Sequence, residues 1–394
     1  MWKAFVIVLL QLTLSSLSEV PSSGAEASVK PLTIPVKEGF VTVNVDGQEI
    51  GLFLDSGYPD LTMLDGHWYE QEYGKDACKE PDAGCYFCPE DDPCDFEETE
   101  LPLTRFGDNT TLKSVPRSGS LRLADREAAD FDFSVARVVH WGSPSKPHGF
   151  FGLSRIPTNP EEYEYSDDSE SLIDSLVDHG LIERPSYTFR TNTTQNGLSI
   201  SGQLTLGEKL DESTAAKYKW QKIVYSEKFY EALATVWVSS VKMSGGRRSL
   251  LPLESRASEY RGPNLTIIDT GGPIVSLAIP GLQEDLEKLL RLKLRRKGYE
   301  DEKIARMFRR NENGFLYVKQ RVFKFLPVLK LSLDDGSNSV SIKIYAQHYC
   351  VGLESGELGL MLQSGTVSVL GTPFFWAYSI YVNFDDHKIA LLRN

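Results

Sequence analysis

The chain has 394 residues, which is enough for two domains that each bury a core of their own. It is 41% hydrophobic and 25% charged, a composition typical of a globular protein. The formal net charge of −13 argues against nucleic acid or an anionic membrane as a partner. It also suits an acidic compartment, where protonation of carboxylates lowers the self-repulsion of the chain.

The first residues indicate targeting. Lys3 precedes an apolar run that ends near Leu14, and the later Ala25-Glu26-Ala27 is a small-x-small cleavage pattern. The run is too short to cross a bilayer. We therefore expect a signal peptide over residues 1–27, a short segment over 28–37, and secretion or delivery to an acidic vacuolar or lysosomal compartment. No membrane contact is expected after the signal is removed.

Short β-rich runs bounded by Gly, Pro, Asn and Asp dominate the remaining chain and predict an all-β architecture. In chain order these runs cover residues 39–45, 50–54, 131–139, 186–190, 198–206, 234–243, 266–268, 328–333, 340–345, 367–370, 380–384 and 389–392. Two helices are expected, one over 171–179 and one from Pro280 to Gly298. The second helix has acidic residues early and basic residues late, as the helix dipole favours. We interpret its basic end as a solvated face, with a docking patch as the alternative.

The cysteines and glycosylation sequons fit an oxidising compartment. Cys78, Cys85, Cys88 and Cys94 lie in one acidic loop, and their spacing lacks the paired knuckles of common zinc modules. Two local disulfides are the preferred interpretation, and their pairing stays open. The expected glycan acceptors each stand two residues before a threonine, and they are Asn109, Asn192 and Asn264.

One motif order occurs twice. An apolar pair leads into Asp55-Ser56-Gly57, and another leads into Asp269-Thr270-Gly271. Each motif is followed by a second apolar pair with a glycine, Gly152 after 97 positions and Gly371 after 102. Two homologous halves of similar length explain this repeat.

The repeat predicts a pair of facing carboxylates. An Asp at the end of an apolar strand, followed by a glycine turn, is held rigidly at the sheet edge. If Asp55 and Asp269 face each other, both cannot be ionised together, so the pair shares one proton. The ionised member can then activate a water while the protonated member binds a carbonyl oxygen.

With these motifs the chain resembles the pepsin-like aspartic peptidases over almost its whole mature length. Three further segments carry the resemblance: Gly149 to Leu153, the helix with Gly180-Leu181-Ile182 after it, and the closing strands from Val369 to Leu391. The resemblance implies a bilobal fold, with an N-terminal lobe over 38–196 and a C-terminal lobe over 197–394. It also implies an endopeptidase that takes a polypeptide in a cleft between the lobes, without metal or cofactor and as a monomer.

In that family, the residues after each catalytic Asp support the pair. By resemblance, the Ser56 and Thr270 hydroxyls lock the two turns, with Gly57 and Gly271 completing them. A hairpin, the flap, covers the family cleft, and we align its end with Ser118-Gly119-Ser120, which puts Pro116 at its tyrosine position.

Several residues depart from the family pattern. Tyr58 replaces a serine after the first motif, and Gly272 and Pro273 replace a hydroxyl after the second. A tryptophan that supports the flap becomes Thr62, and Tyr58 and Trp68 are the candidates to replace it. Cys350 aligns with half of a disulfide and is expected to be a buried free thiol, with an intermolecular bridge as the alternative.

The leading hypothesis is an acidic-pH aspartic endopeptidase. The alternative is a pseudoenzyme that binds peptide or protein in the cleft without cutting it. A glycosidase also uses two carboxylates, but bonded hydroxyls beside them have no role there. Serine or cysteine hydrolysis is disfavoured because no histidine lies near a nucleophile-elbow motif.

Overall fold

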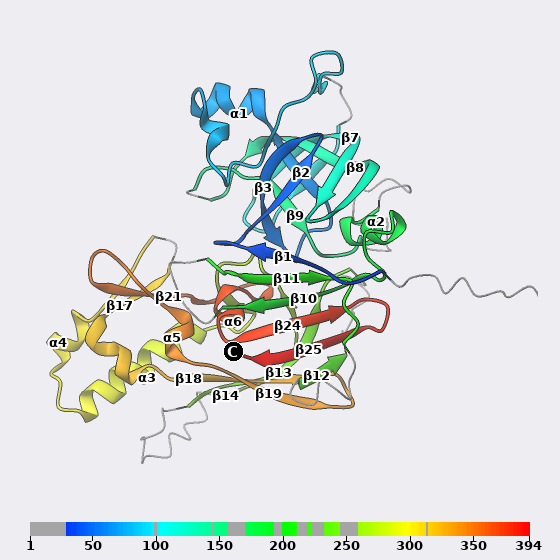
Figure 1. The fold of residues 1–394 in the computed structure, drawn as a ribbon. Coiled ribbons are helices and arrows are strands. Elements are labelled where there is room, and N and C mark those ends of the chain that lie inside the picture. Colours follow the sequence, from blue (N-terminus) through cyan, green and yellow to red (C-terminus); the bar gives the residue numbers. More distant parts are fainter. Residues whose placement is uncertain are drawn as a thin grey trace, which may run out of the picture.

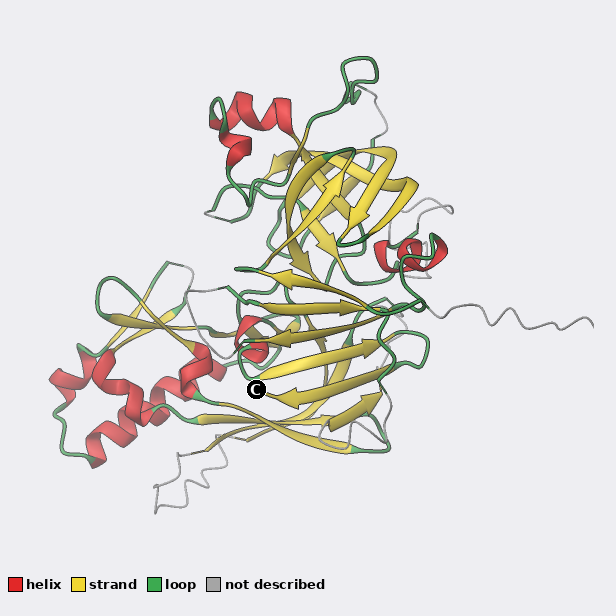
Figure 2. Ribbon diagram, viewed as in Figure 1, coloured by secondary structure: helices red, strands yellow, loops and turns green. Residues whose placement is uncertain are grey.

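The structure is a computed structural model that describes residues 29–97, 101–143, 145–156, 170–192, 199–210, 219–222, 232–244, 259–312 and 314–394. The expected signal peptide and the expected lobe boundary at 196 and 197 lie outside the described residues. In the described part, strands dominate and the helices are few and mostly short (Figure 2), as the sequence predicted. No described helix is both long enough and apolar enough to cross a membrane.

The first lobe is built on an eight-stranded sheet (Figure 1). Its path is β2-β3-β9-β4-β8-β7-β6, β5 pairs with β4, and β2 also pairs with β7, so the sheet curls on itself. In that order the strands are β2 (Phe40–Val45), β3 (Gln48–Asp55), β9 (Phe150–Gly152), β4 (Leu61–Asp65), β8 (Arg126–His140), β7 (Thr111–Leu123), β6 (Leu103–Arg105) and β5 (Cys85–Tyr86).

A second lobe contains a seven-stranded sheet and a small four-stranded sheet. The larger sheet runs β19 (Ser339–Ile344), β18 (Val328–Asp334), β13 (Thr235–Ser244), β14 (Glu259–Ile268), β23 (Ser368–Leu370), β15 (Val275–Leu277) and β22 (Leu362–Ser364). The smaller runs β16 (Phe308–Arg310), β17 (Leu316–Lys319), β21 (Glu357–Leu360) and β20 (Cys350–Gly352). Strand β18 alternates buried and half-exposed residues, the period of a sheet with one face on the core.

A six-stranded sheet joins the two lobes (Figure 1). Its order is β1 (Leu32–Val36), β11 (Gly202–Leu206), β10 (Ser186–Thr191), β24 (Tyr378–Asn383), β25 (Lys388–Arg393) and β12 (Lys219–Lys222). Every residue of β24 is buried, as expected of a central strand covered on both faces. The main hydrophobic core contains residues of all three large sheets.

The helices decorate the sheets. They are α1 (Gly66–Tyr73), α2 (Leu172–Asp178), α3 (Leu282–Arg296), α4 (Asp301–Ala305), α5 (Ala346–Tyr349) and α6 (Thr372–Phe375), with 3₁₀ turns η1 (Ala77–Lys79) and η3 (Gln320–Phe325). The two helices expected from the sequence are α2 and α3. The side chain of Ser171 caps α2 by accepting a hydrogen bond from the Asp174 backbone N–H.

The repeated motifs have matching surroundings in the two lobes. Strand β3 pairs in parallel with β9, which pairs antiparallel with β4. Strand β14 likewise pairs in parallel with β23, which pairs antiparallel with β15. In each lobe, the strand that leads to the Asp therefore pairs in parallel with the strand of the second glycine motif.

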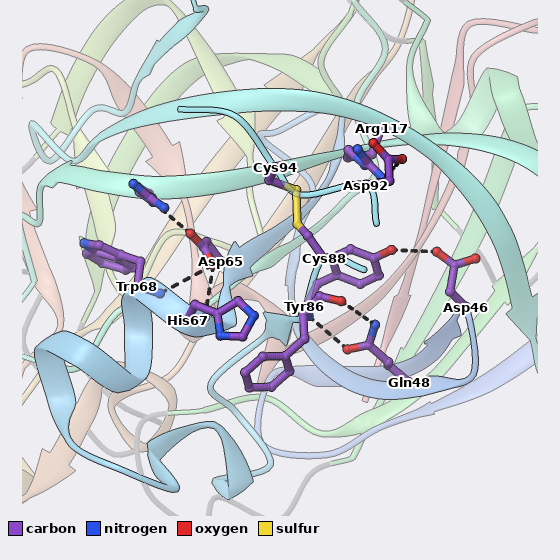
Figure 3. Close-up of a disulfide and its surroundings, with 12 residues drawn as sticks. Asp46, Gln48, Asp65, His67, Trp68, Tyr86, Cys88, Asp92, Cys94 and Arg117 are labelled. Atoms are coloured by element: carbon purple, nitrogen blue, oxygen red, sulfur yellow. Dashed lines mark hydrogen bonds and ion pairs between the residues drawn. A yellow bond between two sulfur atoms is a disulfide. The ribbon is translucent and has the colours of Figure 1, made fainter. Parts of the chain in front are cut away.

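The four clustered cysteines form the disulfides Cys78–Cys85 and Cys88–Cys94, so no thiol of that loop is left for a metal. Figure 3 shows the second disulfide beside two anchors of the loop. The Tyr86 hydroxyl donates to Asp46 at 2.7 Å, and Gln48 makes two hydrogen bonds to the backbone of the loop. An ion pair between Arg117 and Asp92 ties the loop to β7. The cysteine-containing loop is thus attached to the sheet at several points.

Candidate active site

The site begins at two equivalent turns, one in each lobe. Asp55 is the last residue of β3, and Asp269 directly follows β14. The preceding Leu54 and Ile268 are fully buried, which anchors both turns in the core. In each turn, the backbone N–H two residues on donates to the carboxylate at 2.8 Å, from Gly57 to Asp55 Oδ1 and from Gly271 to Asp269 Oδ1. Both carboxylates are therefore held by their own turns.

Two buried hydroxyls cross-link the turns. The Ser56 backbone N–H donates to Thr270 Oγ1 at 2.9 Å, and the Thr270 N–H donates to Ser56 Oγ at the same distance. Each hydroxyl in turn donates to the opposite strand, Thr270 to the Leu54 carbonyl at 2.8 Å and Ser56 to the Ile268 carbonyl at 3.2 Å. These four reciprocal bonds fix one turn relative to the other.

Each carboxylate lies against the opposite glycine. A Cβ on Gly57 would come within 3.1 Å of the Asp269 carboxylate, and a Cβ on Gly271 would come within 2.6 Å of the Asp55 carboxylate. Any side chain at these positions would displace the neighbouring Asp. The two glycines are needed because they let the carboxylates approach each other.

Different neighbouring groups shift the pKa values of the two carboxyls. Burial, and then the charge of Asp269, raise the pKa of Asp55 well above its ordinary 3.8. Burial also raises the pKa of Asp269, but the N–H groups of Gly271, Gly272 and Gly57 and a hydrogen bond from Asp55 act against that rise. The pair therefore holds one proton between its two carboxyls over a range of pH.

Tyr58 fills the space beside the first turn. Its side chain is 4% exposed, and its hydroxyl is 2.8 Å from Oγ1 of the buried Thr62. Its ring lies 5.2 Å from the ring of Phe106 and 5.5 Å from that of Phe150. Of the two candidates to replace the missing support of the flap, Tyr58 is the one that makes this contact.

A hairpin beside the site joins β6 to β7. The Phe106 N–H donates to the Thr110 carbonyl, and the Asn109 N–H donates to the Phe106 carbonyl, which closes a tight turn. Phe106 stacks on Phe150 at 4.8 Å and contacts Tyr58. The charge of Asp108, in the same turn, adds to the rise in the pKa of Asp55, so this turn lies close to the pair of carboxylates.

The predicted placement of the flap at Pro116, Ser118, Gly119 and Ser120 is wrong. Pro116 pairs with Ser134 in the middle of the β7–β8 ladder. The Ser120 N–H donates to Asp46 Oδ1 at 2.8 Å, and the same carboxylate leaves no space for a Cβ on Gly119. These residues pack against the β2–β3 turn instead. The better signal was Gly107-Asp108-Asn109, a run of turn formers between two strand-like segments.

The backbone of Gly272 supports the second turn where the family's hydroxyl is missing. Gly272 and Pro273 supply no hydroxyl, yet the Gly272 N–H helps to lower the pKa of Asp269. The Gly272 carbonyl accepts bonds from the Thr372 N–H at 2.8 Å and from its hydroxyl at 3.2 Å. Thr372 directly follows the second glycine motif of this lobe, so it fixes the turn that holds Asp269.

Tyr187 is a neighbour of the site that the sequence did not reveal. It is 1% exposed on β10, and burial raises the pKa of its phenol while a hydrogen bond with the Ser56 hydroxyl acts against that rise. No motif marks this residue, because β10 reaches the site only through the sheet that joins the lobes.

The remaining predicted residues lie away from the carboxylates or at the edge of the site. Asn109 and Asn192 are exposed and Asn264 is half-buried on β14, and their glycosylation stays a prediction. The Cys350 thiol is free and buried, and burial raises its pKa. Among the described residues, no cluster of three or more His, Cys, Asp or Glu could hold a metal.

No family model matches the chain, and no curated protein matches it in sequence. Among solved structures, the aspartic proteinase from Irpex lacteus matches 93% of this chain and 98% of its own, with a TM-score of 0.62 and 11% identity. A likeness at this identity establishes the fold alone. The chain therefore has the bilobal, mostly β, pepsin-like fold that its motif order predicted, and that prediction is confirmed.

Proposed function

We propose that the chain is an aspartic endopeptidase that hydrolyses peptide bonds of proteins with Asp55 and Asp269. One observation carries the proposal: the reciprocal Ser56 and Thr270 bonds hold the buried Asp55 carboxylate and the half-buried Asp269 carboxylate against each other from opposite lobes. A carboxylate pair built only for stability would be costly, because burial and like charge both oppose ionisation. Such a pair is useful where one member must give a proton and the other must take one.

In the proposed mechanism, ionised Asp269 takes a proton from a water held between the carboxylates. The water oxygen bonds to the peptide carbonyl carbon, and Asp55 gives its proton to the carbonyl oxygen, which yields a gem-diol. The C–N bond then breaks as Asp269 returns its proton to the nitrogen. Asp55 recovers a proton from one diol hydroxyl, and the pair is restored.

The proposed substrate is a polypeptide in extended form, which pairs its main chain with the β6–β7 hairpin in the manner of strand addition. The Phe106 ring in the hairpin turn offers an apolar contact beside the site. This favours apolar substrate side chains near the cut bond. Passage through the secretory pathway, which the N-terminal segment indicates, would deliver the protein to an oxidising or acidic compartment where its two disulfides persist.

The pH dependence follows from the shared proton. At low pH both carboxyls are protonated and no base is available, and at high pH both are ionised and no proton donor is available. The pKa of each carboxyl is raised by burial, so both limbs of the activity profile move toward less acidic pH than they would for exposed carboxyls. We expect a bell-shaped profile whose maximum lies between about pH 3 and 6.

The test uses the purified chain and a denatured globular protein. Cleavage between pH 3 and 6 that a statine-type transition-state analogue blocks is the expected result. Asp55→Asn and Asp269→Asn should each lower kcat at least about a thousandfold, and the double variant should lose little more. Tight binding of the analogue with no cleavage by the wild type would instead identify a binding protein. Cleavage that persists in both Asn variants would exclude the pair.

A further inference from the structure

The positive charge of this acidic chain is concentrated in one place. Residues 282–325 hold 13 of the 42 Lys and Arg residues and seven of the 55 Asp and Glu residues. We call this segment the basic extension, and it runs from α3 through α4, β16 and β17 to η3. Figure 1 shows α3 and α4 projecting from the side of the second lobe. The negative net charge of the whole chain gives no indication of this local excess of positive charge.

Some of the cations in the basic extension have structural partners. Arg295 pairs with Asp301 at 2.6 Å, Arg291 pairs with Glu287 at the same distance, and Arg309 and Lys319 share Glu357. Six exposed cations of the extension have no ion-pair partner among the described residues. They are Lys288, Arg296, Lys297, Arg306, Arg321 and Lys324. Positive charge kept together without neutralising partners raises self-repulsion, which a bound anion would relieve.

Two exposed apolar side chains accompany these cations. Leu292 of α3 is 38% exposed and Phe323 of η3 is 40% exposed. Lys288, Leu292 and Arg296 stand four residues apart, so they form one stripe along α3. The elements that carry Leu292 and Phe323 are packed together, because Lys293 Nζ donates to the Phe325 carbonyl at 3.0 Å. The opposite face of α3, with Leu286, Leu290 and Leu294, is fully buried.

We propose that the basic extension docks the protein on an anionic lipid surface. Lysine and arginine side chains near such a surface are attracted by its negative potential, and exposed leucine and phenylalanine insert at the boundary between headgroups and acyl chains. A sulfated polysaccharide or a nucleic acid would use the cations but would leave the two apolar side chains in water. The combination of both kinds of side chain on one projecting helical unit favours lipid. This inference does not depend on catalysis.

The test is co-sedimentation of the purified chain with vesicles of phosphatidylcholine alone or with phosphatidylserine added. We expect binding only to the vesicles with phosphatidylserine, and weaker binding as salt rises. The combined variant Arg296→Glu, Lys297→Glu and Arg321→Glu should bind about a hundredfold more weakly. A matched control reverses three exposed cations elsewhere, Lys37→Glu, Lys75→Glu and Lys209→Glu, and should bind as the wild type does. Circular dichroism checks that both variants are folded.

A second variant separates lipid from other polyanions. Leu292→Ser with Phe323→Ser keeps every charge and should weaken vesicle binding several-fold while leaving binding to heparin, a sulfated polysaccharide, unchanged. Three outcomes would overturn the proposal: no vesicle binding at low salt, equal loss in the matched control, or binding to heparin together with vesicle binding that ignores the two apolar side chains.

Discussion

The two Asp turns are built alike at their centres and differently at their edges. Both hold an Asp by the N–H of a glycine, and both exchange a hydroxyl bond with the other turn. Beyond the glycine, the first turn continues as Tyr58-Pro59-Asp60 and the second as Gly272-Pro273-Ile274. These positions correspond, because the Gly152 N–H donates to the Asp60 carbonyl at 3.0 Å and the Gly371 N–H donates to the Ile274 carbonyl at 3.1 Å.

The centres of the two turns are shared by both lobes, and the edges differ from one lobe to the other. The symmetric part holds two carboxylates together with two glycine N–H bonds to the carboxylates and four reciprocal bonds of the Ser56 and Thr270 hydroxyls. The asymmetric part gives the first turn a buried phenol and a carboxyl, and gives the second turn a small residue whose N–H favours ionised Asp269. The two carboxyls therefore lie in different surroundings, although burial raises the pKa of both.

The largest expected effect comes from breaking the symmetric part. Thr270→Val removes the hydroxyl that accepts from the Ser56 N–H and donates to the Leu54 carbonyl, and it leaves both partners buried. We expect the free energy of unfolding to fall by about 2 kcal/mol. Displacement of the carboxylates should lower kcat/KM by about a hundredfold. Denaturant unfolding and peptide cleavage measure the two effects.

Thr270→Ser is the control, because it keeps the hydroxyl and should keep most of the stability and activity. Ser56→Ala tests the same contact from the first lobe, where the hydroxyl accepts from the Thr270 N–H. If the two turns are equivalent at their centres, Ser56→Ala and Thr270→Val should cost similar amounts. Unchanged activity in Thr270→Val, or equal damage in Thr270→Ser, would show that the hydroxyl exchange does not position the pair.

A smaller effect is expected from the asymmetric support of the first turn. Tyr58→Phe keeps the ring against Phe106 and Phe150 but removes the hydroxyl bonded to Thr62. We expect a loss of about 1 kcal/mol in the free energy of unfolding. If the hydroxyl positions the hairpin turn, KM should rise on the order of tenfold with a smaller change in kcat.

Tyr73→Phe is the matched control for that change. Because Tyr73 is 39% exposed on α1, this substitution should change neither the free energy of unfolding nor KM. A loss of stability in Tyr58→Phe with no change in KM would reduce Tyr58 to a packing residue. A fall in kcat at constant KM would place its role at the carboxylates instead of the hairpin.

The sequence could predict the symmetric part because it is local. Asp55, Ser56 and Gly57 act within one turn, and the repeat at Asp269 supplies the partner without any knowledge of distances. The same reasoning yielded the bilobal fold, because the repeated motif order predicts two similar halves, and a structural neighbour with only 11% identity shares that fold.

The hairpin could not be placed in this way, because its position depends on pairing between distant strands. Ser118-Gly119-Ser120 resembles the end of the family's flap motif in sequence, but the structure pairs this segment within the β7–β8 ladder, and the turn near the carboxylates is the one between β6 and β7. The contact of Tyr187, the choice between Tyr58 and Trp68, and the packing of η3 beside the cations of α3 likewise required the packed structure. A net charge of −13 says nothing of where the charges lie.

The last expected effect, on stability alone, concerns Asp60, whose counterpart in the second lobe is the apolar Ile274. Burial raises the pKa of Asp60 from 3.8 to about 6, while a hydrogen bond from Tyr58 acts against the rise. Because this pKa is higher in the folded chain than in the unfolded chain, the stabilisation is complete below about pH 4 and is lost as pH rises through about 6. Asp60→Asn should remove that loss and gain about 3 kcal/mol over the wild type at pH 7, with little difference at pH 4. Thermal unfolding at both pH values measures this, with the exposed Asp132→Asn as control. If Asp60→Asn and the wild type differ in melting temperature by the same amount at both pH values, Asp60 ionises freely and the two lobes do not differ in this respect.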